Sequence, residues 1–293
     1  MEKISVIIPL FNKEHCICKT IESVLNQTHT YFELIIVNDG STDHSLDLAK
    51  SYQDKRIRII DKENEGVSMT RNRGAKEADS ELLLFLDADD YLYPYCLEIL
   101  SDLHSRYPTF DLWSANYTKM VGDIKYTVLS DAISGFIDNP YKLIYEKKWN
   151  FRPGSFIITK KSFFERGGFP SHMTVGEDWY FMDMYCEKFR CVYTPISVMS
   201  YIQEYRALSK SDVNLNMTIE WHYIFQGKNR WQKMSYSENI FKRVVISVMR
   251  LNFRHAIALI RKYHIWNFIG FFSAVISYMK SRNHDMIYND EES

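Results

Sequence analysis

The chain has 293 residues, of which 46% are hydrophobic and 25% are charged, and this composition excludes a mainly disordered or fibrous protein. Its 36 Lys and Arg residues offset 37 Asp and Glu residues, so the formal net charge of -1 gives no general attraction for nucleic acid. The five cysteines lack paired spacing, which predicts reduced thiols and neither a disulfide scaffold nor a zinc site.

The two ends of the chain differ in character. The first residues run into a short apolar stretch that Pro9 interrupts, a pattern that does not predict a signal peptide and favours a cytoplasmic protein. From Lys228 to Arg282 there are 11 basic residues and one acid, whereas the last eleven residues contain four acids. The remaining part, residues 1–227, carries a net charge of -7.

The first hundred residues alternate between strand-like and helix-like patterns. Apolar runs rich in branched side chains, typical of strands buried on both faces of a parallel sheet, cover 3–8, 32–37, 56–60 and 81–86. Helical patterns fill the gaps between them, at 17–25, 46–49 and 67–78. Repeated strand-helix-strand units predict an open α/β sheet with right-handed connections.

The alternation becomes less regular after residue 90. Helices are expected over 94–106, 161–166 and 179–188, and strands over 111–119, 125–129 and 156–159. The segment 133–149 matches no single pattern.

Ligands of open α/β sheets bind beyond the carboxyl ends of the strands, so the residues that follow each predicted strand are candidates for a site. These segments are 9–12, 38–43, 61–66 and 87–90, and three of the four contain acids. The acids Asp87, Asp89 and Asp90 repel one another unless a cation or hydrogen-bond donors lie among them. This edge therefore predicts a metal and nucleotide site, although 38–41 also has ordinary turn chemistry.

A second acidic group, Glu177 and Asp178, opens the predicted helix near residue 179. Acids at a helix start commonly complement the helix dipole. The neighbouring Trp179 and Tyr180 favour a pocket instead, because aromatic rings beside carboxylates suit sugar faces and hydroxyl groups.

These residues lie within stretches that together resemble glycosyltransferase family 2, inverting enzymes of the GT-A fold. The stretches are SVIIPLFNKE near the start, SVLNQTHTYFELIIVNDGSTD at 23–43, NEGVSMTRNRGAKEADSELLLFLDADD at 64–90, and ERGGFP followed by GEDWYF at 165–181. The resemblance covers about residues 3–205. It implies a Rossmann-like, mostly parallel α/β sheet flanked by helices, and transfer of a sugar from a nucleotide-sugar donor.

The resemblance also implies roles for single residues at the donor site. Asp39 would contact the base, commonly uracil; Arg71 would approach the diphosphate or neighbouring carboxylates; and Asp87 would bind the ribose. Asp89, the second acid of a D-x-D motif, would coordinate Mn²⁺ or Mg²⁺ on the diphosphate. The full donor-binding set is Pro9, Phe11, Asn12, Glu14, Asp39, Asn64, Gly66, Arg71, Asp87, Ala88 and Asp89.

On the acceptor side, the resemblance makes Asp178 the general base that takes the proton of the attacking hydroxyl. Glu177 would support it or orient the acceptor, and Trp179 and Tyr180 would line the acceptor site. Direct displacement of this kind inverts the anomeric configuration.

The sequence departs from the family pattern after residue 200. Processive members have Gln-x-x-Arg-Trp, whereas Gln203 and Arg206 are followed here by Ala207, which favours an enzyme that adds a single sugar. The segment 201–204 also lacks the Arg and His that non-processive relatives often show there. Glu204 is a candidate third metal ligand in their place.

Residues 228–282 lie outside the resemblance. A basic amphipathic helix is expected over 241–251, and the uncharged run 265–279 is shorter than the roughly 20 residues of a bilayer span. Two alternatives stay open. The segment binds the anionic inner face of a cell membrane, where a lipid-linked acceptor would lie, or it packs on the catalytic domain.

The sequence thus predicts three parts: a GT-A domain over 1–210, with a nucleotide-binding half at 1–90 and an acceptor half at 91–210, a helical extension over 211–283, and a disordered acidic tail over 284–293. The predicted function is sugar transfer from a UDP-hexose or UDP-N-acetylhexosamine to a saccharide or lipid-linked saccharide, in bacterial surface polysaccharide synthesis. The alternatives are an inactive binding module and a nucleotidyltransferase. The latter lacks support because 4–14 contains no glycine-rich phosphate loop.

Overall fold

A computed structural model describes residues 2–129, 133–173 and 176–203, the positions 230–234, 236, 240, 244 and 247, and helix α10 (Phe253–Tyr263). The chain divides into two compact units. One comprises Met1–Pro140 with Lys147–Ala207, and the other comprises Tyr141–Glu146 with Leu208–Ser293. The predicted acidic tail over 284–293, most of the predicted helical extension and Glu204 lie outside the described residues.

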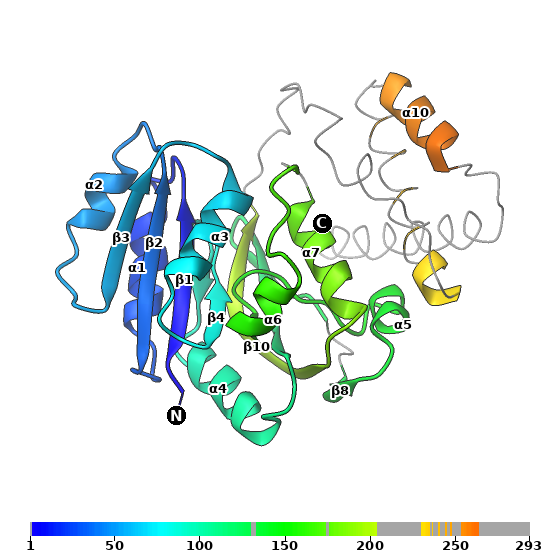
Figure 1. Ribbon diagram of the computed structural model, residues 1–293, viewed down its shortest axis with the longest axis horizontal. Coiled ribbons are helices and arrows are strands. Elements are labelled where there is room, and N and C mark those ends of the chain that lie inside the picture. Colours follow the sequence, from blue (N-terminus) through cyan, green and yellow to red (C-terminus); the bar gives the residue numbers. More distant parts are fainter. Residues whose placement is uncertain are drawn as a thin grey trace, which may run out of the picture. The chain divides into compact units, whose positions relative to one another are not determined.

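The first unit is built on one mixed sheet (Figure 1). The strand order along it is β3-β2-β1-β4-β9-β6-β10-β5, with β7 paired to β6 and β8 to β10. Its strands are β1 (Ile4–Leu10), β2 (Phe32–Asp39), β3 (Ile57–Lys62), β4 (Leu82–Phe85), β5 (Tyr91–Leu92), β6 (Leu112–Val121), β7 (Ile124–Thr127), β8 (Gly135–Ile137), β9 (Phe156–Thr159) and β10 (Cys191–Gln203). The expected α/β fold with flanking helices is confirmed.

The parallel half of the sheet agrees with the sequence prediction. β1 pairs in parallel with both β2 and β4, and β2 pairs in parallel with β3. The other half is mixed: β9 runs antiparallel to β4 and β6, while β10 runs parallel to β6. Three strands are longer than predicted, so that Pro9, Asn38 and Asp61 lie within strands and not in the loops after them.

Helices cover both faces of the sheet. In the first unit these helices are α1 (Ile17–Leu25), α2 (Ser45–Lys50), α3 (Val67–Glu77), α4 (Cys96–Arg106), α6 (Lys160–Glu165) and α7 (Glu177–Cys186). Two further described helices, α5 (Pro140–Tyr145) and α10, lie at least partly in the second unit. Figure 1 shows α3, α6 and α7 on the near face. On that face the rings of Phe85, Phe163, Phe169 and Phe181 form one cluster. Within it Phe169 stacks on Phe181, with centroids 4.4 Å apart.

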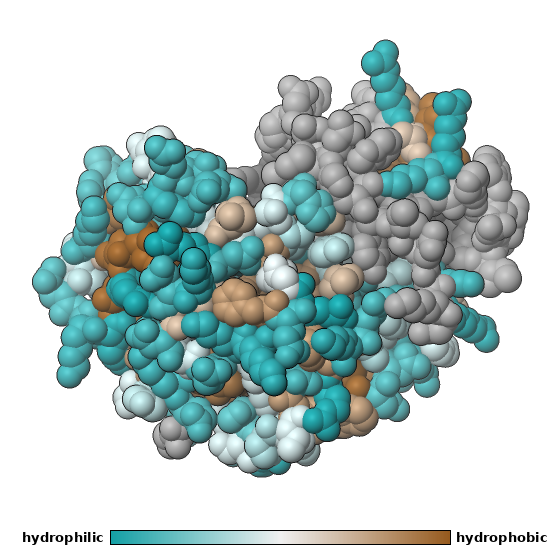
Figure 2. Space-filling model, in the orientation of Figure 1, coloured by the Kyte–Doolittle hydropathy of each residue, from teal (hydrophilic) through white to brown (hydrophobic). Residues whose placement is uncertain are grey.

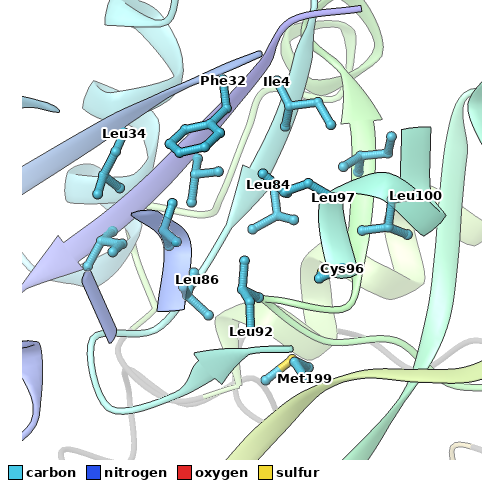
Figure 3. Packing of buried hydrophobic residues seen from close by; sticks show 14 of the residues in the cluster. Ile4, Phe32, Leu34, Leu84, Leu86, Leu92, Cys96, Leu97, Leu100 and Met199 are labelled. Carbon is cyan, nitrogen blue, oxygen red and sulfur yellow. The ribbon is translucent and has the colours of Figure 1, made fainter. Parts of the chain in front are cut away.

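The opposite face of the sheet carries the largest hydrophobic cluster. Alternate residues of β1, including Ile4, Val6 and Ile8, pack there with Ile21 of α1 and Leu97 of α4, all fully buried. Figure 3 shows Ile4, Leu84, Leu97 and Leu100 converging from β1, β4 and α4. On the face shown in Figure 2, the described residues are mainly hydrophilic and the hydrophobic ones form small separate areas. Burial of the alternating apolar side chains therefore fixes the strand ends that carry the candidate site.

The second unit is described only in part. In α10, Ala256 and Leu259 are buried, whereas Phe253 and Ile257 are exposed beside the exposed Arg254. No described helix has the length and hydropathy that a membrane crossing requires, and the run 265–279 lies outside the described residues.

Candidate active site

Arg71 joins the two acidic groups that the sequence singles out. It lies on α3 with its side chain 4% exposed, and its guanidinium donates to Asp87 Oδ1 at 2.6 Å and to Glu177 Oε1 at 3.1 Å. Asp87 follows β4 and Glu177 opens α7, so three separate elements meet at one side chain. A planar guanidinium suits this bridge because its donors point at two carboxylates at once.

The bridge determines the charge state of its members. Burial raises the pKa of Asp87, but the Arg71 charge, aided by Arg152, outweighs burial and holds this pKa below its usual value. The pKa of Glu177 is raised because burial and the neighbouring Asp178 outweigh Arg71. The pKa of Arg71 itself is raised by its acidic partners in spite of burial, so it stays positively charged.

Asn72 of α3 connects this helix to the Gly-Gly-Phe-Pro stretch at 167–170. Its side chain donates to Phe169 O and accepts from Phe169 N, both at 2.8 Å. Gly168 has a φ of +72°, and a Cβ there would lie 2.5 Å from Asn72 Oδ1, so a glycine is required. The Phe169 ring then lies against the Arg71 guanidinium, with 4.9 Å from Cζ to the ring centroid. Helix α3 and the stretch 167–170, which are far apart in the sequence, are thus held together beside Arg71.

Asp89 forms an ion pair with Lys13, and its side chain is 31% exposed. In the described part of the chain, no three His, Cys, Asp or Glu side chains gather to hold a metal by themselves. A divalent cation nevertheless fits Asp89, because Mg²⁺ is commonly held by one or two carboxylates together with substrate phosphates. Glu204, the candidate third ligand, lies outside the described residues.

The other members of the acidic loop have structural partners. Ala88 is buried, and its carbonyl accepts from Thr20 Oγ1 at 2.8 Å. Asp90 accepts from Ile202 N at 2.8 Å through Oδ1, while its buried Oδ2 has no hydrogen-bond partner. Asp90 therefore anchors β10 through its side chain.

Asp39, expected at the base, is buried and organises the loop after β3. Its carboxylate accepts from Glu65 N at 2.9 Å and from Gly66 N at 3.0 Å, and it pairs with Lys62. Burial raises the pKa of Asp39, but these donors outweigh it and lower the pKa below the usual value. Asn64 donates to Asp39 O at 3.0 Å. Lys62, Glu65, Gly66 and the Thr70 side chain thus surround this carboxylate with donors.

The first loop is tied to the loop after β2. Asn12, at a φ of +49°, accepts from Thr42 N at 2.8 Å, and Glu14 accepts from His44 N at 3.0 Å. Pro9 pairs with Val37 inside the sheet. Phe11 is 45% exposed, so its ring is available to a ligand. Asn12 and Glu14 therefore hold the loop after β1 against the loop after β2. The exposed ring of Phe11 can contact a ligand.

A small cavity of about 60 Å³ adjoins the acidic pair. Asp178 and Trp179 line it, together with Tyr117, Asn150 and Arg152, while neither Glu177 nor Tyr180 does. Trp179 N donates to Asp178 Oδ1 at 2.8 Å, which fixes that carboxylate at the start of α7. Asp178 and Trp179 thus face one cavity, as expected of a base and an acceptor-side ring. Tyr180 lies near the ring of His172, at 6.2 Å between centroids.

Three cations at the site were not predicted from the sequence: Lys13, Lys62 and Arg152. Lys13 stands inside the stretch FNKE and follows β1, so the strand-end rule that selected its neighbours also applies to it. Lys62 is the last residue of β3. Arg152 lies in an irregular segment with no local pattern, and only the three-dimensional structure reveals its place.

The glycosyl transferase family 2 model matches residues 5–171, more than half of the chain. The chain belongs to glycosyl transferase family 2. The chain is 35% identical over 159 residues to "Putative glycosyltransferase EpsH" of Bacillus subtilis, a match that covers 50% of this chain and 45% of EpsH. It is 30% identical over 213 residues to "Glycosyltransferase GlyA" of Streptococcus pneumoniae, covering 68% of this chain and 30% of GlyA.

The family match agrees with solved structures. A crystal structure of S. aureus TarS 1–349 superimposes with a TM-score of 0.60 at 22% identity, over 68% of this chain and 60% of TarS. The same protein in complex with UDP-GlcNAc gives a TM-score of 0.60 at 23% identity, over 69% and 58%. The chain shares the fold of these structures. The chain spans less than half the length of the curated relatives EpsH and GlyA that it matches.

Proposed function

We propose that the chain transfers a sugar from a UDP-sugar, a UDP-hexose or UDP-N-acetylhexosamine, to a hydroxyl of a saccharide or lipid-linked saccharide, with inversion. The observation that carries this proposal is the Arg71 bridge between Asp87 and Glu177. It holds the proposed donor-binding acid Asp87 and Glu177, the neighbour of the proposed base Asp178, on one guanidinium within the first unit of the fold. Such rigid positioning is what a displacement between two bound substrates needs.

On the donor side, Phe11 is proposed to stack on the base, Asp39 to contact the base, and Asp87 to bind the ribose. Asp89 would hold Mn²⁺ or Mg²⁺, which neutralises charge on the departing diphosphate when bound. Lys62, Asn64 and Gly66 support Asp39 by keeping its loop in place. The uridine base is favoured because the TarS fold neighbour binds UDP and UDP-GlcNAc.

On the acceptor side, Asp178 is proposed as the general base. It lines the cavity beside Trp179, whereas Glu177 is held by Arg71 and does not line the cavity. The acceptor oxygen attacks the anomeric carbon as its proton passes to Asp178, and the bond from that carbon to the diphosphate oxygen breaks on the opposite face. Glu177 keeps α7 attached to Arg71 and so positions Asp178. Attack from one face and departure from the other invert the anomeric centre.

The setting of the reaction is proposed from chemistry and relatives. Named glycosyltransferases of several bacteria match this chain, which supports a role in bacterial surface polysaccharide synthesis. The exposed Phe253, Arg254 and Ile257 of α10 support contact with an anionic membrane surface on the cytoplasmic side. Nucleic acid is not an expected partner, because the balanced net charge gives no attraction for it.

Calorimetric titration with UDP, GDP and dTDP, each with and without Mn²⁺, tests the donor class. We expect UDP to bind most tightly and Mn²⁺ to increase its affinity. Asp89→Asn should remove the Mn²⁺ effect, and the exposed Asp102→Asn on α4 serves as the matched control. Turnover of a UDP-sugar with Asp178→Asn should fall about 10²- to 10⁴-fold while UDP still binds. Absence of nucleoside diphosphate binding would refute the proposal, and binding without turnover would favour an inactive binding module.

A further inference from the structure

Three cations lie at the acidic edge of the site, and two of them are paired with carboxylates. Arg71 binds Asp87 and Glu177, and Lys13 pairs with Asp89. Arg152 differs from both. Among the described residues it has no carboxylate oxygen within 4.0 Å, and its buried Nε has no hydrogen-bond partner.

The loop that carries Arg152 is fixed between β4 and β10. Gly154 N donates to Phe85 O at 2.5 Å, next to the end of β4. Gly154 has a φ of +91°, and a Cβ there would lie 2.4 Å from Met199 Sδ of β10, so the loop packs closely against that strand. Arg152 N donates to Ser155 Oγ at 3.1 Å and closes the turn. The position of Arg152 is therefore built into the fold.

The guanidinium itself rests on an aromatic platform. Its Cζ lies 3.4 Å from the ring centroid of Tyr201 and 5.7 Å from that of Tyr117. The residue after Tyr201 donates its backbone N–H to Asp90, so this platform adjoins the acidic loop. Stacking on a ring holds the plane of a guanidinium and leaves its edge free for an anion.

Arg152 acts on the charges of the acidic loop and of the adjoining cavity. The Arg152 charge lowers the pKa of Asp87 and opposes the burial that raises the pKa of Asp90, so it acts on the loop that carries the D-x-D acids. Arg152 also lines the cavity that contains Asp178. Burial lowers the pKa of Arg152, but Asp90, Tyr117 and Asp87 outweigh burial and raise this pKa, so Arg152 stays charged. Its guanidinium fork matches the geometry of a ligand phosphate.

We propose that Arg152 binds the diphosphate of the nucleotide donor and stabilises it as it departs. This inference rests on the proposed function and adds a residue to it. When the bond from the anomeric carbon breaks, its electron pair stays on the diphosphate oxygen, which gains negative charge. Carboxylates already surround that position, and the other two cations are engaged by them. Arg152 is therefore placed to stabilise the negative charge that develops on the diphosphate oxygen.

Calorimetry with UDP and with uridine, at fixed Mn²⁺, tests this role. For Arg152→Gln we expect UDP affinity to fall roughly 10- to 100-fold, since a hydrogen-bonded charge contact is lost, and uridine affinity to stay unchanged. Arg152→Lys should lose less, because it keeps the charge without the planar fork. Arg106→Gln, an exposed arginine on α4, is the matched control and should bind both ligands like the parent protein.

Each possible result supports or overturns the role of Arg152 in diphosphate binding. Equal UDP affinity in the parent, Arg152→Gln and control proteins overturns the inference, as does an equal loss for UDP and uridine or a change confined to the acceptor KM. If Arg152→Gln fails to fold, Arg152→Lys decides: a selective loss of UDP affinity supports the inference and parental affinity overturns it. A parent protein that binds no nucleoside diphosphate refutes the proposed function itself, whereas tight UDP binding by parent and variant alike refutes only the role of Arg152.

Discussion

Lys13 pairs with Asp89, the carboxylate proposed to hold the metal ion. Lys13 follows β1 and Asp89 follows β4, and these two strands are neighbours in the parallel half of the sheet. Both side chains are partly exposed, at 25% and 31%. The ammonium group and an incoming divalent cation are therefore competitors for the same carboxylate, because both need its oxygen atoms.

This competition predicts that Lys13→Gln increases apparent metal affinity. The Mn²⁺ concentration for half-maximal UDP binding should fall about fivefold, since a partly exposed ion pair is worth up to roughly 1 kcal/mol. Calorimetric UDP titrations across a Mn²⁺ series measure it, and Lys19→Gln on α1 is the control. A higher midpoint in Lys13→Gln would mean that Lys13 assists the diphosphate and does not compete with the metal.

The Arg71 bridge predicts a large stability effect. Arg71→Met leaves Asp87 and Glu177 partly buried without their cation, so the free energy of unfolding should fall by about 3–5 kcal/mol. Chemical denaturation measures the change. Arg73→Met is the control on the same helix, because Arg73 is 50% exposed and its pair with Glu77 lies on the surface. Equal effects of the two substitutions would contradict a structural role for the bridge.

The sequence predicted the parallel half of the fold because each strand there is a short apolar run bounded by polar turns. It did not predict β10, a 13-residue strand that contains Pro195. Proline removes a ladder hydrogen bond and argues against a strand. The structure accommodates it at an irregularity, where the register with β6 shifts between Thr194 and Ser197 and the strand becomes exposed.

The sequence singled out Arg71, Asp87 and Asp178 because they follow strands or lie in family stretches, and the structure places Arg71 against Asp87. The partners of those residues were not predictable. The pairing of Asp39 with Lys62 depends on the register between β2 and β3, which aligns the two residues. Arg152 reaches the site through a turn whose place depends on Gly154 and β10, elements that no local pattern links.

The raised pKa of Asp90 predicts that the free energy of unfolding decreases as pH rises. Burial and the neighbouring Asp87 raise the pKa of Asp90 well above its usual value. Between the unfolded and folded pKa values, the folded state therefore binds more protons than the unfolded state, and its stability falls as pH rises. Asp90→Asn keeps an acceptor for Ile202 N and removes the charge, so it should match or exceed parental stability near pH 7 and lose this part of the pH dependence.

Asp90→Ala is the contrasting variant. It leaves Ile202 N without its side-chain acceptor and should lower the free energy of unfolding by about 1–3 kcal/mol. Denaturation from pH 4 to pH 8 compares the three proteins. A clear loss of stability in Asp90→Asn near pH 7 would show that the ionised carboxylate itself stabilises the fold.

Gly74 lets α3 approach β1 closely and so places Arg71. A Cβ at position 74 would lie 2.4 Å from Ile7 Cγ2, and Ile7 is fully buried in the sheet. In an open helix position, Gly→Ala gains about 1 kcal/mol from helix propensity. Here the contact is with a fixed methyl group, so Gly74→Ala should reverse that sign and lower the free energy of unfolding by about 1–3 kcal/mol.

Two further variants test the cause of that loss. Ile7→Ala removes the opposing methyl group, so Gly74→Ala should cost less in the Ile7→Ala background than in the parent protein, and a double-mutant cycle measures this coupling. Lys76→Ala, at an exposed position of the same helix, should change stability by less than about 0.5 kcal/mol. Additive effects of Gly74→Ala and Ile7→Ala would mean that α3 shifts as a whole to admit the Cβ, and the Arg71 bridge to Glu177 would then lengthen with it.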